Sequence, residues 1–485
     1  MVKKTAFCLI TLALALACSR KSGSAPAPAP APVTPGTPVP TGPNEVDFWL
    51  TTGTGTILLE QQATTLSFGN ATNSNATIEV DSAQRFQTMD GFGYTLTGGS
   101  AQLINGMSAP ARTALLQELF GSSGSAIGVS YLRVSIGASD LSAAPFTYNE
   151  LPAGQTDTLQ QQFSLAAEQT DLLPVLKQIV QIQPSIKILG SPWTAPRWMK
   201  SNGSYIGGSL LPQYYRAYAR YFVKYIQAMQ AEGIRIDAIT VQNEPQHGGN
   251  NPSMVMSAAE QASFVKDHLG PMFAAAGITT KIIVWDHNAD RPDYPIAVLN
   301  DPAAKAYIDG SAFHLYAGNI SALSQVHNAH PDRNVYFTEQ WIGGPGNFGG
   351  DLKWHVENLM VGAPRNWSRN VLEWNLAADP GYGPHTDQGG CSSCLGALTI
   401  SGSNVLRNTA YYVIAHSSRF VPAGSVRVQS TLVAGLPNVA YTTPAGKKVL
   451  LVLNSGNATR SFNIRQRGRQ VTVPLDPGAV GTFVW

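Results

Sequence analysis

An alternation of strand-like and helix-like segments through the central part of the chain is the feature that most restricts its fold. Short β-prone runs are separated by helical stretches, among them Ala109–Phe120, Thr170–Gln181, Gln213–Glu232 and Ala258–Ala276. Eight strands with intervening helices in roughly 250 to 350 residues are typical of an α/β fold, the (β/α)8 TIM barrel. The eight strands that we expect are Met89–Leu96, Tyr131–Ile136, Ile186–Ser191, Ile236–Gln242, Lys281–Asp286, Ala312–Tyr316, Asn334–Glu339 and Val371–Asn375.

A doubly wound open sheet is the main alternative for this pattern. Such a sheet usually carries a glycine-rich phosphate loop between an early strand and a helix. The segment Gly91–Gly93 lacks the third glycine and the following helix start. The barrel is therefore favoured, and nucleotide binding is not.

Both ends of the folded region show short β-prone runs without helical periodicity. In residues 46–86 these runs are Phe48–Leu50, Ile57–Leu59, Leu66–Phe68 and Thr77–Val80. Residues 419–485 contain similar runs from Val426 onward. Each segment alone has too few strands for a sheet domain. We therefore expect the N- and C-terminal segments to form one β-sandwich attached to a barrel at residues 87–418. Trp49 and Trp485 are expected to pack in its core.

The first 17 residues have the character of a signal peptide. Lys3 and Lys4 precede an apolar run that ends at Cys18 and is too short to span a bilayer. Cleavage after Ala17 fits ordinary secretion, but Leu16–Ser19 resembles a lipoprotein box with lipidation at Cys18. A Pro/Ala-rich spacer follows, giving a linker at 18–45. We therefore expect an exported protein, a bacterial lipoprotein at the cell surface or in the periplasm, and otherwise a secreted one.

The charge balance argues against polyanionic partners. Two of the 32 basic residues lie in the predicted signal peptide, so 30 basic residues face 30 acidic ones in the mature chain. Binding to nucleic acid or to an anionic membrane surface depends mainly on excess positive charge. We expect a neutral, hydroxyl-rich ligand and membrane contact only through the lipid anchor.

Two of the four cysteines remain after the signal, Cys391 and Cys394. In an oxidising compartment a small disulfide loop is the favoured interpretation. A metal site with His385 and Asp387 is a minority alternative, because zinc needs three or four ligands at suitable spacings. No cofactor or metal is predicted.

Two glutamates follow apolar strands of the predicted barrel. Glu244 comes after the fourth strand, between Asn243 and Pro245, and Glu339 ends the seventh. Because barrel enzymes carry their chemistry at the carboxyl ends of the strands, both should face one centre. Cleavage of a glycosidic bond needs one carboxyl group to protonate the leaving oxygen and a second to meet the charge at the anomeric carbon. We predict Glu244 as proton donor, with a pKa raised by its partner, and Glu339 as nucleophile, with retention of configuration.

Polar and aromatic side chains at the other strand ends suit a sugar. An asparagine beside the acid can bind the 2-hydroxyl, basic and phenolic groups can orient the nucleophile, and tryptophans offer faces to a pyranose ring. The predicted substrate-binding residues are Arg133, Asp140, Trp193, Asn243, His314, Tyr316, Trp341 and Trp374.

Several of these residues have plainer interpretations. His314 can be a hydrogen-bonded core histidine, and Asp140 can cap a turn. Glu373 is a rival carboxylate, but it lies within the eighth strand and is expected to face outward or to pair with a base. Glu232 ends a helix and is expected to be a solvated charge.

The chain resembles glycoside hydrolase family 30, the group that contains lysosomal glucosylceramidase and endo-β-1,6-glucanases. The resemblance runs in family order over about residues 46–485. The matching stretches are Phe86–Gly93, Leu132–Val134, Ser191–Lys200, Gln242–Gln246, Phe313–Tyr316, Phe337–Trp341 and Trp374–Ala377. The resemblance implies a barrel with a side β-sandwich, Glu244 as acid/base, Glu339 as nucleophile, and the other residues named above, Trp341 apart, around the sugar.

Two features bear on the substrate. Relatives commonly carry Thr-Asp after the first strand, where this chain has Thr97-Gly98. The loop Gly381–Leu398, with its cysteine pair, is expected to shape the leaving-group side. A β-glucoside hydrolase of glucosylceramidase type is the leading hypothesis. Alternatives are an endo-β-1,6-glucanase, a β-xylosidase or β-fucosidase, and a surface glycan-binding protein without activity.

Overall fold

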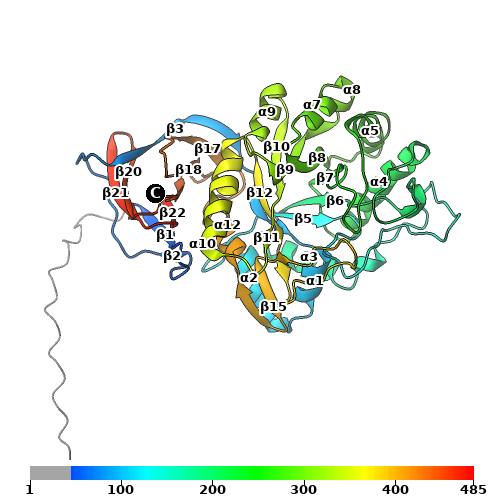
Figure 1. Ribbon diagram of the computed structural model, residues 1–485, viewed down its shortest axis with the longest axis horizontal. Coiled ribbons are helices and arrows are strands. Elements are labelled where there is room, and N and C mark those ends of the chain that lie inside the picture. The colour runs from blue at the N-terminus through cyan, green and yellow to red at the C-terminus, as the bar shows by residue number, and fades with distance from the viewer. Residues whose placement is uncertain (1–44) are drawn as a thin grey trace, which may run out of the picture. The chain divides into compact units, whose positions relative to one another are not determined.

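The computed structural model describes residues 45–485 (Figure 1). The predicted signal peptide at 1–17, the lipidation site at Cys18 and all but the last residue of the linker lie outside this range. Within residues 45–485, no helix combines the length and the apolar character needed to cross a membrane.

Eight parallel strands form the central barrel, in the spatial order β10-β9-β8-β7-β6-β5-β4-β12 (Figure 1). The ring closes between β10 and β12, where the backbone N–H of Arg369 donates to Val335 (2.9 Å) and that of Trp374 to Gln340 (2.8 Å). All eight predicted strands are present, so the barrel prediction is confirmed. The strands are β4 (Gly91–Thr95), β5 (Tyr131–Ser135), β6 (Lys187–Ser191), β7 (Ala238–Thr240), β8 (Lys281–Ala289), β9 (Ile308–Gly318), β10 (Asn334–Glu339) and β12 (Asn370–Asn375).

The sixth barrel strand begins four residues earlier than predicted, at Ile308. The added residues Asp309-Gly310-Ser311 lie in the strand beside β10. A Cβ atom on Gly310 would come within 2.1 Å of the Asn334 carbonyl oxygen. The glycine is therefore needed for the close approach of two strands rather than for a turn.

The outer helices follow the predicted pattern with one interruption. The predicted helices at 109–120, 170–181 and 213–232 correspond to α2 (Ala109–Phe120), α3 (Leu172–Ile182) and α4 (Tyr215–Ala231). The predicted single helix at 258–276 is instead α5 (Ala258–Phe264), a π-helical segment η4 (Val265–Leu269) and α6 (Gly270–Ala275). Pro271 has no N–H to donate to the preceding turn, which favours the wider winding before it.

The remaining helical segments are mostly short. They are α1 (Gly98–Asn105), η1 (Ala166–Glu168), η2 (Arg197–Met199), η3 (Pro212–Tyr214), α7 (Asp293–Leu299), α8 (Pro302–Lys305), α9 (Ala322–Ala329), α10 (Phe348–His355), the π-helical η5 (Val356–Gly362), α11 (Ala363–Arg365) and α12 (Thr409–Ser418).

The N- and C-terminal segments form the predicted β-sandwich together. Its strands have the order β2-β1-β22-β19-β18-β17-β3-β20-β21. The long strand β3 pairs antiparallel with β17 and parallel with β20, so it belongs to both layers. The strands are β1 (Asp47–Thr51), β2 (Glu60–Gln61), β3 (Ala76–Thr88), β17 (Val426–Ser430), β18 (Asn438–Thr442), β19 (Lys448–Leu453), β20 (Arg460–Gln466), β21 (Arg469–Leu475) and β22 (Val480–Val484).

Two of the β-prone runs predicted in the N-terminal segment are not strands. Ile57–Leu59 lies in a loop whose backbone bonds back to the Thr52 side chain, and Leu66–Phe68 is extended without a ladder. Their apolar side chains are partly or fully buried without belonging to a strand, which local β-propensity cannot reveal. Trp485 packs edge-on against Phe68 in the sandwich as expected, whereas Trp49 contacts Phe420 beyond the last barrel helix.

The helix α12 joins the barrel to the sandwich through a buried histidine. The Nδ1 atom of His416 lies 2.9 Å from the Thr482 hydroxyl in β22, and its Nε2 atom lies 2.8 Å from the Thr51 hydroxyl in β1. The ring has no exposure to solvent. Burial lowers the pKa of His416 to about 3, so the folded protein holds the ring neutral at neutral pH.

We predict that His416 makes the fold sensitive to acid. The folded protein resists protonation of the ring, whereas the unfolded chain takes up a proton below about pH 6.5. This group should therefore lower the free energy of unfolding by about 2 kcal/mol between pH 7 and pH 5. His416→Gln keeps a donor and an acceptor but does not titrate. Urea unfolding at both pH values should show a smaller decrease for the variant, and equal decreases would contradict the prediction.

Candidate active site

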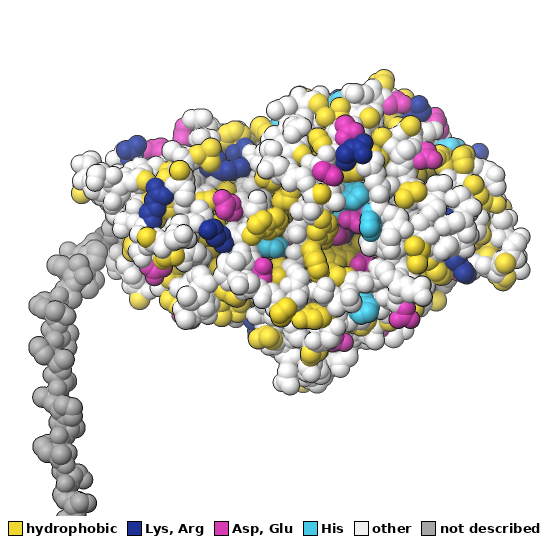
Figure 2. Space-filling view, in the orientation of Figure 1, with side chains coloured by type: hydrophobic (Ala, Val, Ile, Leu, Met, Phe, Trp, Pro, Cys, Tyr) yellow, Lys and Arg dark blue, Asp and Glu magenta, His cyan; other side chains and the backbone are white. Residues whose placement is uncertain are grey.

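A cavity of about 290 Å³ opens at the carboxyl ends of the barrel strands. In the space-filling view, histidine and acidic side chains gather with hydrophobic ones on the face over the barrel (Figure 2). The cavity is lined by Asp140, Trp193, Glu244, His247, Asn250, His287, Asn288, Tyr316, Glu339, Trp341, Trp374, Cys391 and Cys394.

The site follows from the two-residue period of the barrel strands. A buried cluster with members from seven of the eight barrel strands includes Tyr131, Leu189, Ala238, Ala312 and Tyr336. Because side chains alternate along a strand, the residue two positions later in each strand points the same way, one layer nearer the carboxyl end. Five of the seven positions in this layer are polar, and in the same order they are Arg133, Ser191, Thr240, His314 and Thr338. The other two, on β8 and β12, are Trp285 and Trp374.

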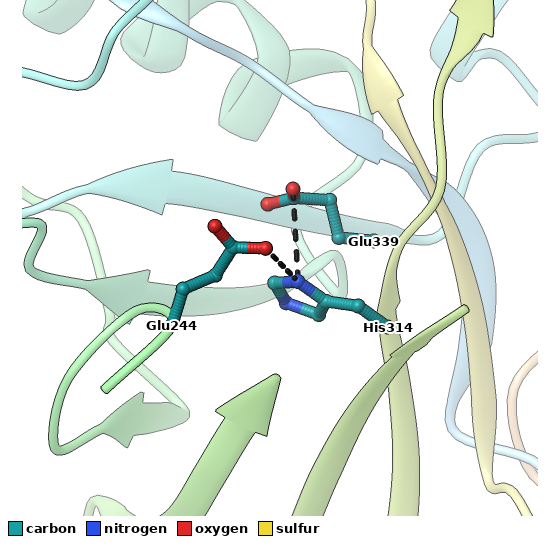
Figure 3. Close-up of side chains that lie close together, drawn as sticks. All are labelled: Glu244, His314 and Glu339. Atoms are coloured by element: carbon teal, nitrogen blue, oxygen red, sulfur yellow. Dashed lines mark hydrogen bonds and ion pairs between the residues drawn. The ribbon is translucent and has the colours of Figure 1, made fainter. Parts of the chain in front are cut away.

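The two glutamates face each other above this layer (Figure 3). Glu339 ends β10, and Glu244 follows β7. A carboxylate oxygen of each and a ring nitrogen of His314 all lie within 4.8 Å of one another. Glu244 has a φ of +44°, a strained value for a residue with a side chain. Its backbone N–H donates to the carbonyl oxygen of Asp286 (2.9 Å), which helps to hold it.

Arg133 holds Glu339 in place from the interior of the barrel. Its guanidinium is completely buried and donates to Glu339, to the Asn243 amide oxygen (2.6 Å) and to Asp286 (2.8 Å). The guanidinium carbon also lies 4.7 Å from the ring centre of Trp193. The hydroxyl of Tyr316 donates to the other oxygen of Glu339 (3.0 Å). Glu339 is therefore held in one orientation by a cation and a phenol.

Asp286 is the centre of the buried network. One of its oxygens accepts from Arg133, Ser191 and Thr240, and the other accepts from Thr338 (2.6 Å). Burial raises the pKa of Asp286, but the charge of Arg133 and the hydrogen bond from His314 outweigh it and hold the pKa far below its ordinary value. The carboxylate stays ionised in the protein interior because every lone pair direction meets a donor.

His314 links this anion to both glutamates. Its Nε2 atom lies 3.1 Å from Asp286, and its Nδ1 atom lies 3.2 Å from Glu244 and 3.7 Å from Glu339. Burial lowers the pKa of His314, but the surrounding carboxylates outweigh it and raise the pKa to about 9. The ring is therefore an imidazolium at neutral pH. The same three side chains have a spacing that a metal ion could use.

The pKa values of the two glutamates in the substrate-free site run opposite to the sequence-based prediction. Burial, with the charges of Glu244 and Asp286, raises the pKa of Glu339 above its ordinary value. For Glu244 the effect of burial is outweighed by the hydrogen bond and charge of His314, and its pKa lies below the ordinary value. The cause is the position of the imidazolium, which is closer to Glu244. Two carboxyls this near to each other titrate as a pair.

The predicted tryptophan platforms are less open than expected. Trp193 and Trp374 stack on each other with ring centres 5.3 Å apart and are 1% and 3% exposed. They therefore offer mainly edges to the cavity, whereas Trp341 is only partly buried and leaves more of its ring free. Asp140 also lines the cavity, and burial with the nearby glutamate charges raises its pKa to about 8.

The loop after β12 crosses the mouth of the barrel. Its strand β14 (Cys394–Leu395) pairs with β11 (Ile342–Gly343), which follows Glu339. The Thr386 N–H donates to the carbonyl of Asp140, and its hydroxyl donates to that of Asn251. The loop after β12 is thus hydrogen-bonded to the segments that follow β5, β7 and β10. Further short strands in this region are β13 (Ala377–Ala378), β15 (Leu398–Ser401) and β16 (Asn404–Arg407).

Cys391 and Cys394 form a disulfide in this loop and lie in the cavity wall. Both sulfurs are bonded to each other, so neither thiol is free for the alternative metal site with His385 and Asp387.

The rival carboxylates have structural roles. Glu373 lies 2.7 Å from Nδ1 of His355 and is buried, so it pairs with a base as expected. Glu232 caps the end of α4 and pairs with Lys177 at the surface.

Five further residues of the site were not predicted. Asp286, His287 and Asn288 follow one another at the end of β8, and His247 and Asn250 lie in the loop after Glu244. Applying the strand-end rule to the fifth predicted strand, Lys281–Asp286, would have found the first three. The other two lie in a loop whose path the sequence does not reveal.

A TIM barrel with paired carboxylates at the carboxyl ends of two strands is an architecture of glycoside hydrolases. Comparison with known proteins agrees. Residues 89–421 match the TIM-barrel domain of glycosyl hydrolase family 30, and residues 424–483 match the beta sandwich domain of the same family. The chain therefore belongs to glycosyl hydrolase family 30.

Similar proteins within the family have more than one activity. An endo-1,6-beta-D-glucanase of Aspergillus fumigatus is 35% identical over 413 residues, which cover 80% of this chain and 82% of that protein. The lysosomal acid glucosylceramidase of Mus musculus is 28% identical over 454 residues, 86% of this chain and 84% of that one. The solved structure of the endo-beta1,6-glucanase BT3312 has a TM-score of 0.84 and 35% identity, and covers 91% of this chain and 99% of its own.

We predict that Asp286→Asn damages both stability and catalysis. Removing the charge leaves Arg133 and His314 with one carboxylate fewer in a buried site, which should cost about 3 kcal/mol of unfolding free energy. Loss of their orientation should lower kcat/KM on an aryl β-glucoside about 100-fold. Asp293→Asn, which removes an exposed pair with Arg291, is the matched control and should change stability by less than about 1 kcal/mol. A variant at 286 that behaves like this control would contradict the central role of Asp286.

Proposed function

We propose that the protein is a retaining β-glucan hydrolase that cleaves β-1,6-linked glucose chains. The observation that carries the mechanism is the approach of a Glu244 oxygen to a Glu339 oxygen within 4.8 Å. Retaining glycosidases place their carboxyls about 5 to 5.5 Å apart, whereas inverting ones need about 6.5 to 9.5 Å for an intervening water.

The proposed β-1,6 linkage is supported by the activities of the similar proteins described above. Endo-1,6-beta-D-glucanases share 33–35% identity with this chain, and the mouse glucosylceramidase shares 28%. This reverses the order of preference drawn from the sequence, which placed a glucosylceramidase-type enzyme first. Glucosylceramide remains the second candidate substrate.

In the first step, Glu339 attacks the anomeric carbon while Glu244 protonates the leaving oxygen. The bond to the leaving group breaks, and an ester forms between the sugar and Glu339. Arg133 and Tyr316 hold the attacking carboxylate, and their hydrogen bonds stabilise its anionic form. The two carboxyls titrate as a pair, and the proton that they share must lie on Glu244 for this step. Bound substrate favours that position, because its glycosidic oxygen accepts a hydrogen bond from protonated Glu244.

In the second step, Glu244 takes a proton from water, and the resulting hydroxide oxygen attacks the same anomeric carbon. The ester bond to Glu339 breaks, and the product keeps the β configuration. Asn243 is fixed by Arg133 through its amide oxygen, so its N–H₂ group remains for the 2-hydroxyl of the sugar, where a hydrogen bond strengthens in the transition state.

The two glutamates should respond differently to removal of their charge. Glu339→Gln should lower turnover at least about 10⁴-fold on every substrate, because no ester can form. Glu244→Gln should retain more activity on aryl glucosides with good leaving groups, since these need no proton in the first step. Added azide should rescue Glu244→Gln and give a β-configured glucosyl azide. Full activity of Glu339→Gln, or failure of azide to rescue Glu244→Gln on any substrate, would contradict the assigned roles.

The substrate is tested by a side-by-side comparison of β-1,6-glucan, gentiobiose and glucosylceramide. We expect kcat/KM on β-1,6-glucan to exceed that on glucosylceramide by at least about tenfold. Proton NMR of the first product should show the β anomer. Hydrolysis of glucosylceramide alone would contradict the linkage, and an initial α anomer would contradict retention.

A further inference from the structure

The cavity has two walls of different chemistry. One wall consists of the tryptophans and the disulfide between Cys391 and Cys394. The other wall consists of four polar side chains around Glu244. They are His247 and Asn250 from the loop after β7, and His287 and Asn288 from the end of β8.

The polar side chains lie directly beside the carboxyl group of Glu244. The Asn250 amide donates to its Oε2 atom (3.3 Å), and Nε2 of His287 lies 3.9 Å from its Oε1 atom. The backbone N–H of His247 donates to the Glu244 carbonyl (2.8 Å), and its side chain is exposed at the cavity. Asn288 accepts from the backbone N–H of Tyr316 through its amide oxygen (3.0 Å), which leaves its N–H₂ group for another partner.

The position of the proton donor decides which group these side chains meet. The donor must touch the oxygen of the scissile bond, so the leaving group departs past Glu244. It therefore leaves along the polar wall, while the sugar that becomes bound to Glu339 lies against the aromatic one. Burial lowers the pKa of His287 to about 4, so at neutral pH this ring is uncharged and suits neutral hydroxyl groups as donor and acceptor.

We propose that His247, His287 and Asn288 form a hydroxyl-binding subsite for a sugar on the leaving-group side. This inference rests on the proposed function and specifies its substrate class. The enzyme selects a saccharide aglycone, because an alkyl chain in this place would leave polar groups without partners. Sites built to hydrogen-bond a substrate hydroxyl reject analogues that lack it far more strongly than apolar pockets reject an extra group.

The test compares two leaving groups on variants of the exposed residue His247. The substrates are gentiobiose, whose leaving group is glucose, and 4-nitrophenyl β-glucoside, whose leaving group has no sugar hydroxyls. His247→Ala should lower kcat/KM on gentiobiose relative to kcat/KM on the aryl glucoside about tenfold, because one hydrogen bond to the leaving sugar is lost. His247→Asn retains a donor and an acceptor and should recover part of the ratio.

Gln246→Ala provides the matched control. Gln246 is the neighbouring residue on the same loop and is also exposed, but it contacts Arg291 rather than the cavity. For Gln246→Ala, the ratio of kcat/KM on gentiobiose to that on the aryl glucoside should stay within about threefold of the wild-type ratio. Equal loss on both substrates in His247→Ala, or an equal fall of the ratio in Gln246→Ala, would overturn the subsite while β-1,6-glucan cleavage stands. A wild-type enzyme that hydrolyses the aryl glucoside but neither gentiobiose nor β-1,6-glucan would instead overturn the proposed function itself.

Discussion

The buried contact between Arg133 and Asp286 is the interaction on which the upper half of the barrel depends. Two charges without solvent exposure are costly unless each has partners for all its hydrogen-bonding groups. Here six neighbouring side chains supply most of these partners, from strands β6, β7, β9 and β10 and from the segment that follows β7. The network therefore ties together the strand ends beside which both glutamates of the site lie. Its geometry restricts where Glu244 and Glu339 can lie more directly than the loops above them do.

Most of the fold could be predicted from the sequence because its strands have a clear apolar pattern. The strands β5, β6 and β10 have nearly the predicted bounds, and so does helix α2. The exceptions are local conflicts between pattern and packing. Gly310 allows close strand contact before the predicted start of its strand, Pro271 divides a helix, and Ile57–Leu59 is apolar without a ladder partner. Asn334, which Gly310 approaches, is distant in sequence, so local propensity could not reveal that contact. Pro271 and the Thr52 side chain act within a few residues, where they outweigh the apolar pattern.

The site was predicted in part for a similar reason. Glu244 and Glu339 stand at strand ends, a position that sequence can show, and the structure brings them together with Arg133 and His314. Asp286 also stands at a strand end, but its importance comes from the number of donors that converge on it. Against the effect of burial, the pKa of Glu244 is lowered mainly by a hydrogen bond from His314, whose Nδ1 atom lies 3.2 Å from Glu244 but 3.7 Å from Glu339. Sequence spacing contains no information at that scale.

The sandwich has a consequence for the order in which the protein can fold. Strand β22 lies between β1 and β19, so the first and the last strands of the described chain are direct neighbours. During synthesis β1 emerges from the ribosome hundreds of residues before its partner, and its edge stays unpaired until translation has reached Val484. The eight barrel strands form a sheet of their own that does not include β22, so this sheet can begin to assemble in that interval. The open edge of β1 is then a place where a chaperone, or another nascent chain, can pair before the native strand arrives.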